Sequence, residues 1–255
     1  MNKKDIKYWL ILLGVIILVF VGEYYAPKTI NWDTITYGAK DKNPYGSYVV
    51  YNMLEDIFPN QKISAERKSF YDLRNTDLKK KNNYIVIDQY FEPDSLESHS
   101  LLALVNEGGN AFIAAEDFFG KLADTLKIKT DRNVDIKKKE MGLKLVNPLL
   151  KNSKFFNFNK SFLYTFFASI DTAKTTVLGI NDQKDITFIK VPFGKGNFFL
   201  STTPIPYTNY NIIDSLNFQY ISQTLSYLPN TDVIGVNIIR LISLQLNLNR
   251  HYVFF

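Results

Sequence analysis

The stretch Tyr84–Phe118 constrains the fold most, because it contains the pattern of a complete β-α-β unit. Tyr84–Ile87 is an unbroken apolar run rich in β-branched residues, which is typical of a strand covered on both faces. A helix follows with Asp94-Ser95 at its cap, and Gly108-Gly109 ends it in the left-handed conformation that glycine tolerates. Ala111–Ala115 then predicts a second buried strand.

Two strands joined by one helix run parallel, with a right-handed crossover. The acidic residues that follow them, Asp88 after the first strand and Glu116 and Asp117 after the second, are therefore expected at the same carboxyl edge of the sheet. Open α/β folds place their functional sites at this edge. The sequence thus predicts the location of a site before it says anything about its chemistry.

The flanking segments extend this unit into a layered α/β domain. We expect a helix at 46–58 capped by Asn43, a strand at 62–64 beside Tyr84–Ile87, and an amphipathic helix at 215–228. Pro192–Gly196 is turn material and predicts a hairpin. The fold class is α/β, an open and mainly parallel sheet flanked by helices, with a β-rich extension that has no core of its own. The strands expected in this extension are 133–136, 143–146, 162–167, 175–180, 186–191 and 197–201.

The N-terminus, residues 1–26, resembles a membrane anchor. Trp9–Gly22 is apolar and uncharged, and the aromatic residues Tyr8 and Tyr24-Tyr25 at its ends suit the two interfaces of a span from Tyr8 to Tyr25. A cleaved signal peptide is the competing interpretation, but no small-x-small cleavage pattern follows the apolar run. The preceding lysines indicate a cytoplasmic N-terminus, with the domain outside a bacterial inner membrane.

Composition excludes several function classes. The chain of 255 residues has no cysteine, which removes disulfides, thiolate zinc sites and a cysteine nucleophile. Its net charge of +5 comes from short basic clusters flanked by acids, which we interpret as solvated faces rather than a nucleic-acid surface. No cofactor-binding motif is present, and we predict no cofactor.

The segment 233–255 is atypical, because no acidic residue occurs beyond Asp232. Removing one base from a coding string for Trp-Gly-Glu-Tyr-Tyr-Lys yields Gly-Val-Asn-Ile-Ile-Arg, the sequence of Gly235–Arg240. We hypothesise that this tail is out of frame. An intact frame through to the stop on resequencing would refute the idea.

A family resemblance supports the domain assignment. The chain resembles the Bacteroidetes branch of the domain of unknown function 4350 family over about Pro27 to Asp232. The segments that carry the resemblance are 32–33, 42–48, 84–88, 93–94, 108–115, 124–126, 193–196 and 207–210.

This resemblance implies a fold similar to class I glutamine amidotransferase-like domains, with no established activity. It also implies a membrane helix at each end of the chain and genes near MoxR-type AAA ATPase operons. The chain lacks the second helix, and the family's usual segment after the last strand resembles Trp-Asp-Glu-Tyr-Tyr, which agrees with a frame slip.

The catalytic residues of that fold are absent. An amidotransferase needs a thiolate on a strand-to-helix elbow and a histidine base. Glu116-Asp117 takes the place of the elbow, His99 falls on an exposed helix, and His251 lies in the atypical tail. A serine hydrolase would need the same base and a Gly-x-Ser-x-Gly elbow, which the chain lacks.

Two other chemistries have a structural alternative that we prefer. Asp88, Glu116 and Asp117 could ligate a hard cation, yet acids at strand ends commonly cap backbone amides instead. Gly194-Lys195-Gly196 could hold an anion, but it lacks the strand-loop-helix context of a phosphate loop and suits a hairpin turn.

Two polar-aromatic loops remain as recognition candidates at the same edge. The helix start around Asn43 and Tyr45 could receive an anion, although a rigid helix entry explains it as well. Tyr207–Tyr210 combines aromatic and amide side chains, a composition typical of recognition surfaces. The predicted binding residues are Asn43, Tyr45, Asp88, Glu116, Asp117, Tyr207 and Asn209.

The preferred function is a non-catalytic, membrane-anchored binding or assembly module of a bacterial envelope complex, with an envelope protein as partner. A metal-dependent or hydrolytic enzyme that uses Asp88, Glu116 and Asp117 is the alternative. A cytoplasm-facing small-molecule sensor is the third hypothesis, and it requires the opposite orientation of the anchor.

Overall fold

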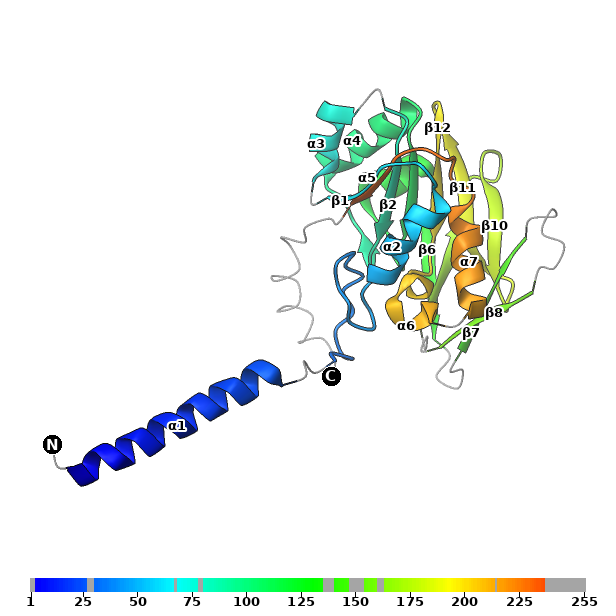
Figure 1. Ribbon diagram of the computed structural model, residues 1–255. Helices are drawn as coiled ribbons and strands as arrows, with labels where there is room; N and C mark the ends of the chain where they lie inside the picture. Colours follow the sequence, from blue (N-terminus) through cyan, green and yellow to red (C-terminus); the bar gives the residue numbers. More distant parts are fainter. Residues whose placement is uncertain are drawn as a thin grey trace, which may run out of the picture. The chain divides into compact units, whose positions relative to one another are not determined.

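A computed structural model describes residues 3–26, 30–66, 68–77, 80–134, 140–146, 154–159, 163–213 and 215–236 (Figure 1). The chain divides into two compact units, Met1–Asn31 and Trp32–Phe255. The first unit contains helix α1, Lys3–Tyr25. Within α1, Ile6–Tyr25 is long and apolar enough to cross a membrane, as the sequence predicted.

The second unit is a mixed α/β domain built on a nine-stranded sheet of order β1-β13-β2-β4-β12-β11-β10-β7-β8. Its first five strands are parallel: β1 Ile63–Glu66, β13 Val233–Val236, β2 Asn83–Ile87, β4 Asn110–Ala114 and β12 Gly196–Ser201. The remaining four are antiparallel: β11 Ile186–Phe193, β10 Thr176–Asn181, β7 Glu140–Leu145 and β8 Phe156–Asn159. The β-rich segment therefore extends the same sheet, but the whole sheet is mixed rather than mainly parallel.

The central β-α-β unit is confirmed. β2 and β4 pair in parallel, joined through helix α4, Ser95–Asn106. Asp94 caps α4, since its carboxylate accepts a 2.8 Å hydrogen bond from the Glu97 N–H. Gly108 after α4 has a φ of 114°, the left-handed conformation expected there.

The strand predicted near residue 62 is present as β1, but its predicted pairing beside Tyr84–Ile87 was wrong. β1 does not pair with β2, because β13 lies between them, parallel to both. The sheet therefore continues past the expected domain boundary at Asp232, since Val233–Val236 is an interior strand between β1 and β2. Residues 237–255, with most of the proposed out-of-frame tail, lie outside the described residues.

Helices cover both faces of the sheet. One face carries α2 Tyr48–Ile57 and α7 Ser215–Leu225, which pack on the inward residues Ile85, Ile87 and Phe112 (Figure 1). The opposite face carries α3 Phe70–Asp77, α4 and α5 Gly120–Leu126. Tyr84 and Val86, which alternate with Ile85 and Ile87 along β2, belong to this second core.

Six further elements, in three groups, complete the carboxyl edge of the parallel strands. The strands β3 Tyr90–Phe91 and β5 Asp117–Phe118 form a two-stranded parallel sheet just beyond β2 and β4. The strands β6 Lys129–Val134 and β9 Leu163–Ser169 form an antiparallel ribbon. After β12, the chain forms the 3-10 turn η1 Ile205–Tyr207 and the short helix α6 Asn209–Ile212.

The Gly194-Lys195 turn joins β11 and β12 as the predicted hairpin. A Cβ atom at Gly196 would lie 1.9 Å from the Gly109 carbonyl oxygen and 2.5 Å from that of Val105. The glycine therefore lets the hairpin approach the C-terminal end of α4. This packing is at the amino edge of the parallel strands, opposite the candidate site.

Candidate functional site

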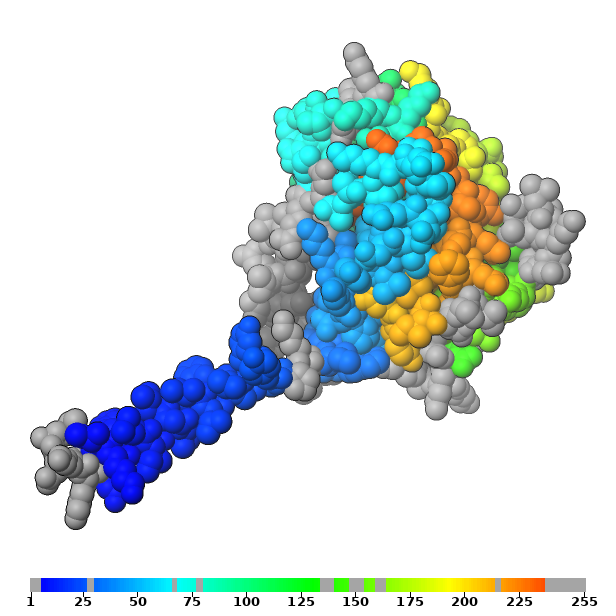
Figure 2. Space-filling model, in the orientation of Figure 1, coloured from blue at the N-terminus to red at the C-terminus, as the bar shows by residue number. Residues whose placement is uncertain are grey.

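The first group of predicted residues, called here the loop group, consists of Asn43, Tyr45 and Asn209. Residues 32–47 and α6 lie side by side on the domain surface, the former in blue and the latter in gold (Figure 2). Two backbone hydrogen bonds of 2.8 Å join them, from Asn209 N–H to the Gly46 carbonyl and from Tyr210 N–H to the Pro44 carbonyl. The structure therefore brings these three residues together, as the shared edge predicted.

Asn209 uses its whole side-chain amide inside the protein. Its Oδ1 accepts a 2.9 Å bond from the Val49 N–H, and its Nδ2 donates to the carbonyls of Asp41 and Asn43 at 2.9 and 2.7 Å. Val49 is in the first turn of α2, so Asn209 supplies the capping bond of this helix. It also fixes the preceding loop on α6.

The prediction that Asn43 caps this helix was wrong. The helix begins at Tyr48, and its N-cap residue Ser47 makes no side-chain capping bond. Asn43 instead forms a tight turn, because its carbonyl accepts from Gly46 and its side chain donates to Asp41 Oδ1 at 2.9 Å. A Cβ at Gly46 would lie 2.1 Å from the Asp41 carbonyl oxygen, so this turn requires glycine there.

Asp41 is the charged residue of the same loop. Burial alone would raise the pKa of the Asp41 carboxyl, but hydrogen bonds from the Thr36 hydroxyl and from the backbone and side chain of Asn43 outweigh it and lower the pKa. The Asp41 charge is thus satisfied by the loop itself. The loop group has the features of a rigid helix entry, the structural alternative recognised from the sequence.

Tyr207 does not join the surface of this group. It is fully buried, with its ring 5.4 Å from that of Phe112 in an edge-on contact and its hydroxyl donating to Thr224 at 2.9 Å. Burial, with a smaller contribution from Tyr220, raises the pKa of this hydroxyl well above its ordinary value. Tyr207 is therefore a core residue, and its predicted role in binding requires access that this structure does not provide.

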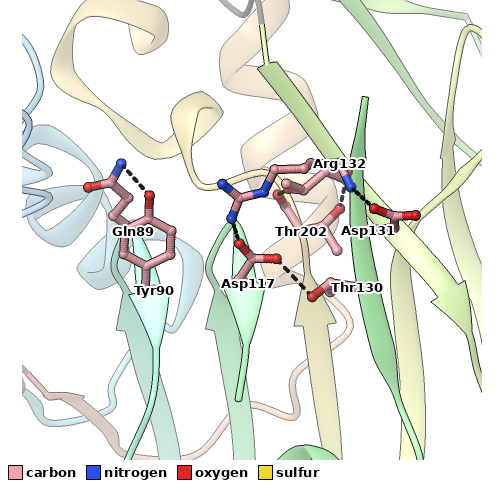
Figure 3. A network of polar contacts seen from close by, with 8 residues as sticks. Gln89, Tyr90, Asp117, Thr130, Asp131, Arg132 and Thr202 are labelled. Carbon is pink, nitrogen blue, oxygen red and sulfur yellow. Dashed lines mark hydrogen bonds and ion pairs between the residues drawn. The ribbon is translucent and has the colours of Figure 1, made fainter. Parts of the chain in front are cut away.

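The second group, called here the strand-end group, follows β2 and β4. Asp88, Glu116 and Asp117 lie at one edge because the Asp88 N–H donates to Ala114 at 3.0 Å and the Glu116 N–H donates to Gln89 at 2.8 Å. The placement of these acids at a common carboxyl edge agrees with the prediction. Gln89 and Tyr90 follow Asp88, and Tyr90 pairs with Asp117 between β3 and β5. Gln89 Nε2 donates to the Tyr90 hydroxyl at 3.3 Å (Figure 3).

Asp117 is the buried member of this group, with 4% of its surface exposed. Its Oδ1 accepts a 2.9 Å hydrogen bond from the Thr130 hydroxyl, and its Oδ2 forms an ion pair with the Arg132 guanidinium (Figure 3). The side chain of Arg132 is 42% exposed, so the pair presents its cationic half to solvent. Both oxygens of Asp117 are thus already engaged by β6.

The ribbon β6–β9 positions Arg132. Arg132 pairs with Thr165 in the ribbon, and Thr165 exchanges hydrogen bonds with Thr202 just after β12. The Thr165 hydroxyl donates to the Thr202 carbonyl at 2.6 Å, and the Thr202 hydroxyl donates to the Thr165 carbonyl at 2.7 Å. The Thr165–Thr202 hydrogen bonds hold β9 against the residue that follows β12, and Arg132 is held there because β6 pairs with β9.

Asp88 and Glu116 are half-buried. Asp88 Oδ1 accepts a 2.6 Å hydrogen bond from the Gln89 N–H, the backbone-capping role expected of an acid at a strand end. Burial, reinforced by the negative charge of Asp88, raises the pKa of the Tyr51 hydroxyl. The charge of Asp88 thus affects Tyr51 of α2, whereas the carboxylate of Asp117 is bound by Thr130 and Arg132 of β6.

The buried residues next to the two groups belong to different cores of the sheet, although the charge of Asp88 also acts on Tyr51 of α2. Tyr37, Ala39 and Tyr207, which surround the loop group, pack in the core under α2 and α7. Phe91 and Phe118, which surround the strand-end group, pack in the core under α4 and α5. The seven predicted residues therefore form two separate clusters and one buried tyrosine, rather than one site.

Sequence reasoning missed Arg132, Thr130, Gln89 and Tyr90. The polar alternation of residues 129–132 was available as a signal, since Thr130 and Arg132 lie two apart and share one side of a strand. Their acidic partner could not be assigned from sequence, because it lies in a separate element, β5.

The remaining candidates have structural roles. Lys195 forms an ion pair with Glu107 at 3.3 Å at the amino edge, so the Gly194-Lys195-Gly196 turn is far along the strands from the candidate site. His99 contacts the Lys121 ammonium on the exposed side of α4. His251 lies outside the described residues.

Comparisons with known proteins identify a family and a fold. The family model "Domain of unknown function (DUF4350)" matches residues 39–225. The mmIFT52 N-terminal domain has a similar structure, with a TM-score of 0.51 and 12% identity over 71% of this chain and 89% of that domain. At this identity the likeness shows the fold alone. A comparison with curated proteins found no match.

Two larger glycosidases contain a weakly similar part. Exo-beta-1,4-mannosidase Op5Man5 from Opitutaceae bacterium strain TAV5 matches 57% of this chain with a TM-score of 0.37 and 11% identity. The beta-galactosidase from Bacillus circulans sp. alkalophilus matches 68% with a TM-score of 0.43 and 14% identity. The chain spans only 24% and 27% of the length of these two proteins.

Proposed function

Since the chain belongs to the DUF4350 family, for which the family description gives no activity, we propose that it is a membrane-anchored binding module that assembles an envelope complex. In this proposal, α1 is an uncleaved single-pass anchor in a bacterial inner membrane. The N-terminus is cytoplasmic and the domain is extracytoplasmic. The partner is an envelope protein, and the family resemblance makes a MoxR-linked system the first place to look for it.

The state of Asp117 is the observation that carries this proposal. A catalytic base or a metal ligand needs a carboxylate oxygen that faces a substrate or an ion. In Asp117 one oxygen is bound by Thr130 and the other by Arg132. The edge instead offers a half-exposed guanidinium beside an amide, a phenol and two further acids. Arginine and tyrosine are enriched at protein interfaces, where such fixed polar groups give specificity.

We also propose that the fold is that of a class I glutamine amidotransferase-like domain from which the nucleophile is missing. The parallel strands with helices on both faces support this assignment. Glu116 and Asp117 follow β4 where the family resemblance would place the nucleophile elbow, and the chain contains no cysteine. The scaffold then serves recognition through the same edge.

Recovery of partners by the full-length anchored protein tests the proposal. We expect cross-linking in intact membranes, followed by affinity capture and mass spectrometry, to recover an envelope protein with the parent chain. Arg132→Glu and Gln89→Arg should abolish that recovery, whereas Lys195→Glu at the opposite edge should retain it. Equal recovery by all three variants, at equal resistance to protease, would contradict the assignment of the site.

The enzyme alternative has a separate test. Among the described residues, no group of three or more His, Cys, Asp or Glu side chains is arranged to hold a metal ion. If Asp88, Glu116 and Asp117 nevertheless form a metal site, calorimetry with Mn²⁺ should give a binding isotherm that the triple alanine variant loses. Such a result would favour the metal-dependent enzyme over the binding module.

The orientation of the anchor can be measured without disturbing the domain. Alkaline phosphatase fused after Asn31, the end of the first unit, is expected to be active, because it folds only outside the cytoplasm. An inactive fusion that is nevertheless present in the membrane would favour the cytoplasm-facing sensor. Fusion before β13 is unsuitable, because it would remove an interior strand of the sheet.

A further inference from the structure

Four exposed or half-exposed residues, Trp32, Ile35, Tyr210 and Ile213, form what we call the apolar patch. The exposed fractions of Trp32, Ile35 and Ile213 are 46%, 41% and 82%. The Trp32 ring packs edge-on against the Tyr210 ring at 5.7 Å, and Tyr210 in turn lies 6.3 Å from Tyr45. The patch therefore joins the first residues of the domain to α6.

The geometry of α6 places Ile213 beside Tyr210. Ile213 has helical dihedral angles, φ −61° and ψ −30°, at the end of this helix. Residues three apart on a helix share one face, so Ile213 extends the surface that Trp32 and Tyr210 begin. Figure 2 shows the surfaces of residues 32–47 and of α6 next to each other. Ile35 precedes Thr36, whose N–H donates to the Tyr45 carbonyl at 3.4 Å.

The length of the segment between α1 and the domain limits how far this patch can lie from the membrane. If α1 spans a membrane, Tyr24-Tyr25 lies at the interface where the chain leaves the lipid. The segment from Tyr25 to Trp32 can extend at most about 25 Å, because each residue adds no more than ~3.6 Å. A compact domain of this size has a radius of gyration of about 17 Å and a diameter of roughly 40 Å. The surface around Trp32 is thus confined near the membrane, whereas the opposite edge is not.

We propose that the apolar patch, Trp32, Ile35, Tyr210 and Ile213, docks on the lipid interface of the membrane that α1 spans. Tryptophan and tyrosine with exposed isoleucine are the residues that enter the interfacial region of a bilayer. The charged neighbours Asp33, Lys40, Asp41 and Lys42 balance one another, so the contact is apolar and does not require anionic lipid. This inference rests on the proposed anchor. It uses no residue of the strand-end group, which is left to bind a protein partner.

Trp32 itself reports the contact. The chain contains only two tryptophans, Trp9 inside the span and Trp32 outside it, so Trp9→Phe leaves Trp32 as the sole tryptophan. The full-length variant is reconstituted in phosphatidylcholine vesicles brominated on the acyl chains, either near the headgroup or near the chain end. We expect the shallow bromines to quench Trp32 emission more strongly than the deep ones. High salt should leave the quenching unchanged.

Matched variants separate docking from mere tethering. Ile213→Asp, at a strongly exposed position, should remove most of the quenching without altering the fold, whereas Asn230→Asp adds the same charge near the amino edge and should have no effect. Ile35→Asp tests the same surface at a second position, by the same measurement of Trp32 quenching. No quenching in the parent, or quenching in Ile213→Asp and Ile35→Asp as strong as in the parent, would overturn the proposal.

Carbonate extraction distinguishes the two levels of failure. A chain that is released from the vesicles by carbonate has no spanning anchor, which overturns the proposed anchor and the lipid contact together. A chain that is retained but whose Trp32 is not quenched keeps the anchor and loses only the lipid contact. Quenching that needs anionic lipid and disappears in high salt would also contradict an apolar contact.

Discussion

At the scale of single residues, Asn209 shows how a polar side chain far away in sequence completes a helix. Val49, at the start of α2, receives its capping bond from a residue 160 positions away. The same amide donates to two loop carbonyls, so three backbone groups depend on one side chain. A buried polar group left without its partner costs more than the bond itself contributes, which gives Asn209 a large effect on stability.

We predict that Asn209→Ala lowers the free energy of unfolding by about 2–4 kcal/mol, through loss of the cap and two unpaired carbonyls. Urea unfolding of the full-length protein in detergent measures this change. Asn230→Ala is the control, because Asn230 is exposed and makes one long bond to Pro59, and its effect should stay within about 0.5 kcal/mol. Equal effects of the two substitutions would contradict the capping role.

Asp41 gives this loop a pH dependence. Its pKa is lowered in the folded protein, so the carboxylate stabilises the fold fully above its unfolded pKa of about 3.9. This stabilisation is lost as the pH falls through the lower, folded-state pKa. The parent protein should therefore lose more stability between pH 7 and pH 3 than Asp41→Asn does, measured by urea midpoints. Parallel curves for the two proteins would show that Asp41 does not contribute.

At the scale of elements, the sequence was most informative where the signal was local. The apolar run of β2, the Asp94 cap and Gly108 lie within the unit that they define, and that unit was predicted correctly. The strands β3 and β5 are only two residues long and have no periodicity to detect. The Asp117–Arg132 pair also escaped prediction, because it depends on how the β6–β9 ribbon meets the sheet. Local chemistry therefore located the edge, and tertiary packing decided which residues remain available there.

The hairpin between β11 and β12 is an element whose sequence serves packing rather than anion binding. Gly196→Ala would place a Cβ atom against two backbone carbonyls, which cannot move as a flexible side chain could. We predict a loss of about 3 kcal/mol in the free energy of unfolding. Lys195→Ala in the same turn removes only an exposed ion pair with Glu107, and it should cost less than about 1 kcal/mol. The reverse order, measured by denaturant unfolding, would favour a functional role for the lysine over the packing role.

At the scale of the whole molecule, the last described strand, β13, inserts between two strands from the first half of the chain. β13 pairs with β1 on one side and with β2 on the other, at positions 170 residues apart for Ile63 and Val233. The Tyr51 ring of α2 packs over this strand, where a Cβ at Gly235 would lie 2.2 Å from Tyr51 Cε1. This arrangement could not be read from the sequence, because a four-residue strand carries no sign of its neighbours. It makes the parallel half of the sheet depend on contacts that form only when residues 233–236 are present.

We therefore predict that a chain ended after Asp232 fails to form the domain, whereas a chain ended after Val236 forms it. Without β13, strand β1 loses the neighbour that pairs it to the sheet, and the apolar edge of β2 is exposed. Limited proteolysis of both chains in membranes should digest the shorter one and leave a resistant domain in the longer one. A resistant domain in the chain ended at Asp232 would contradict the requirement for β13. The pairing of β1 with β13 joins residues that are far apart in the sequence, and such non-local contacts form slowly. Protease resistance should therefore appear only after Val236 has been synthesised.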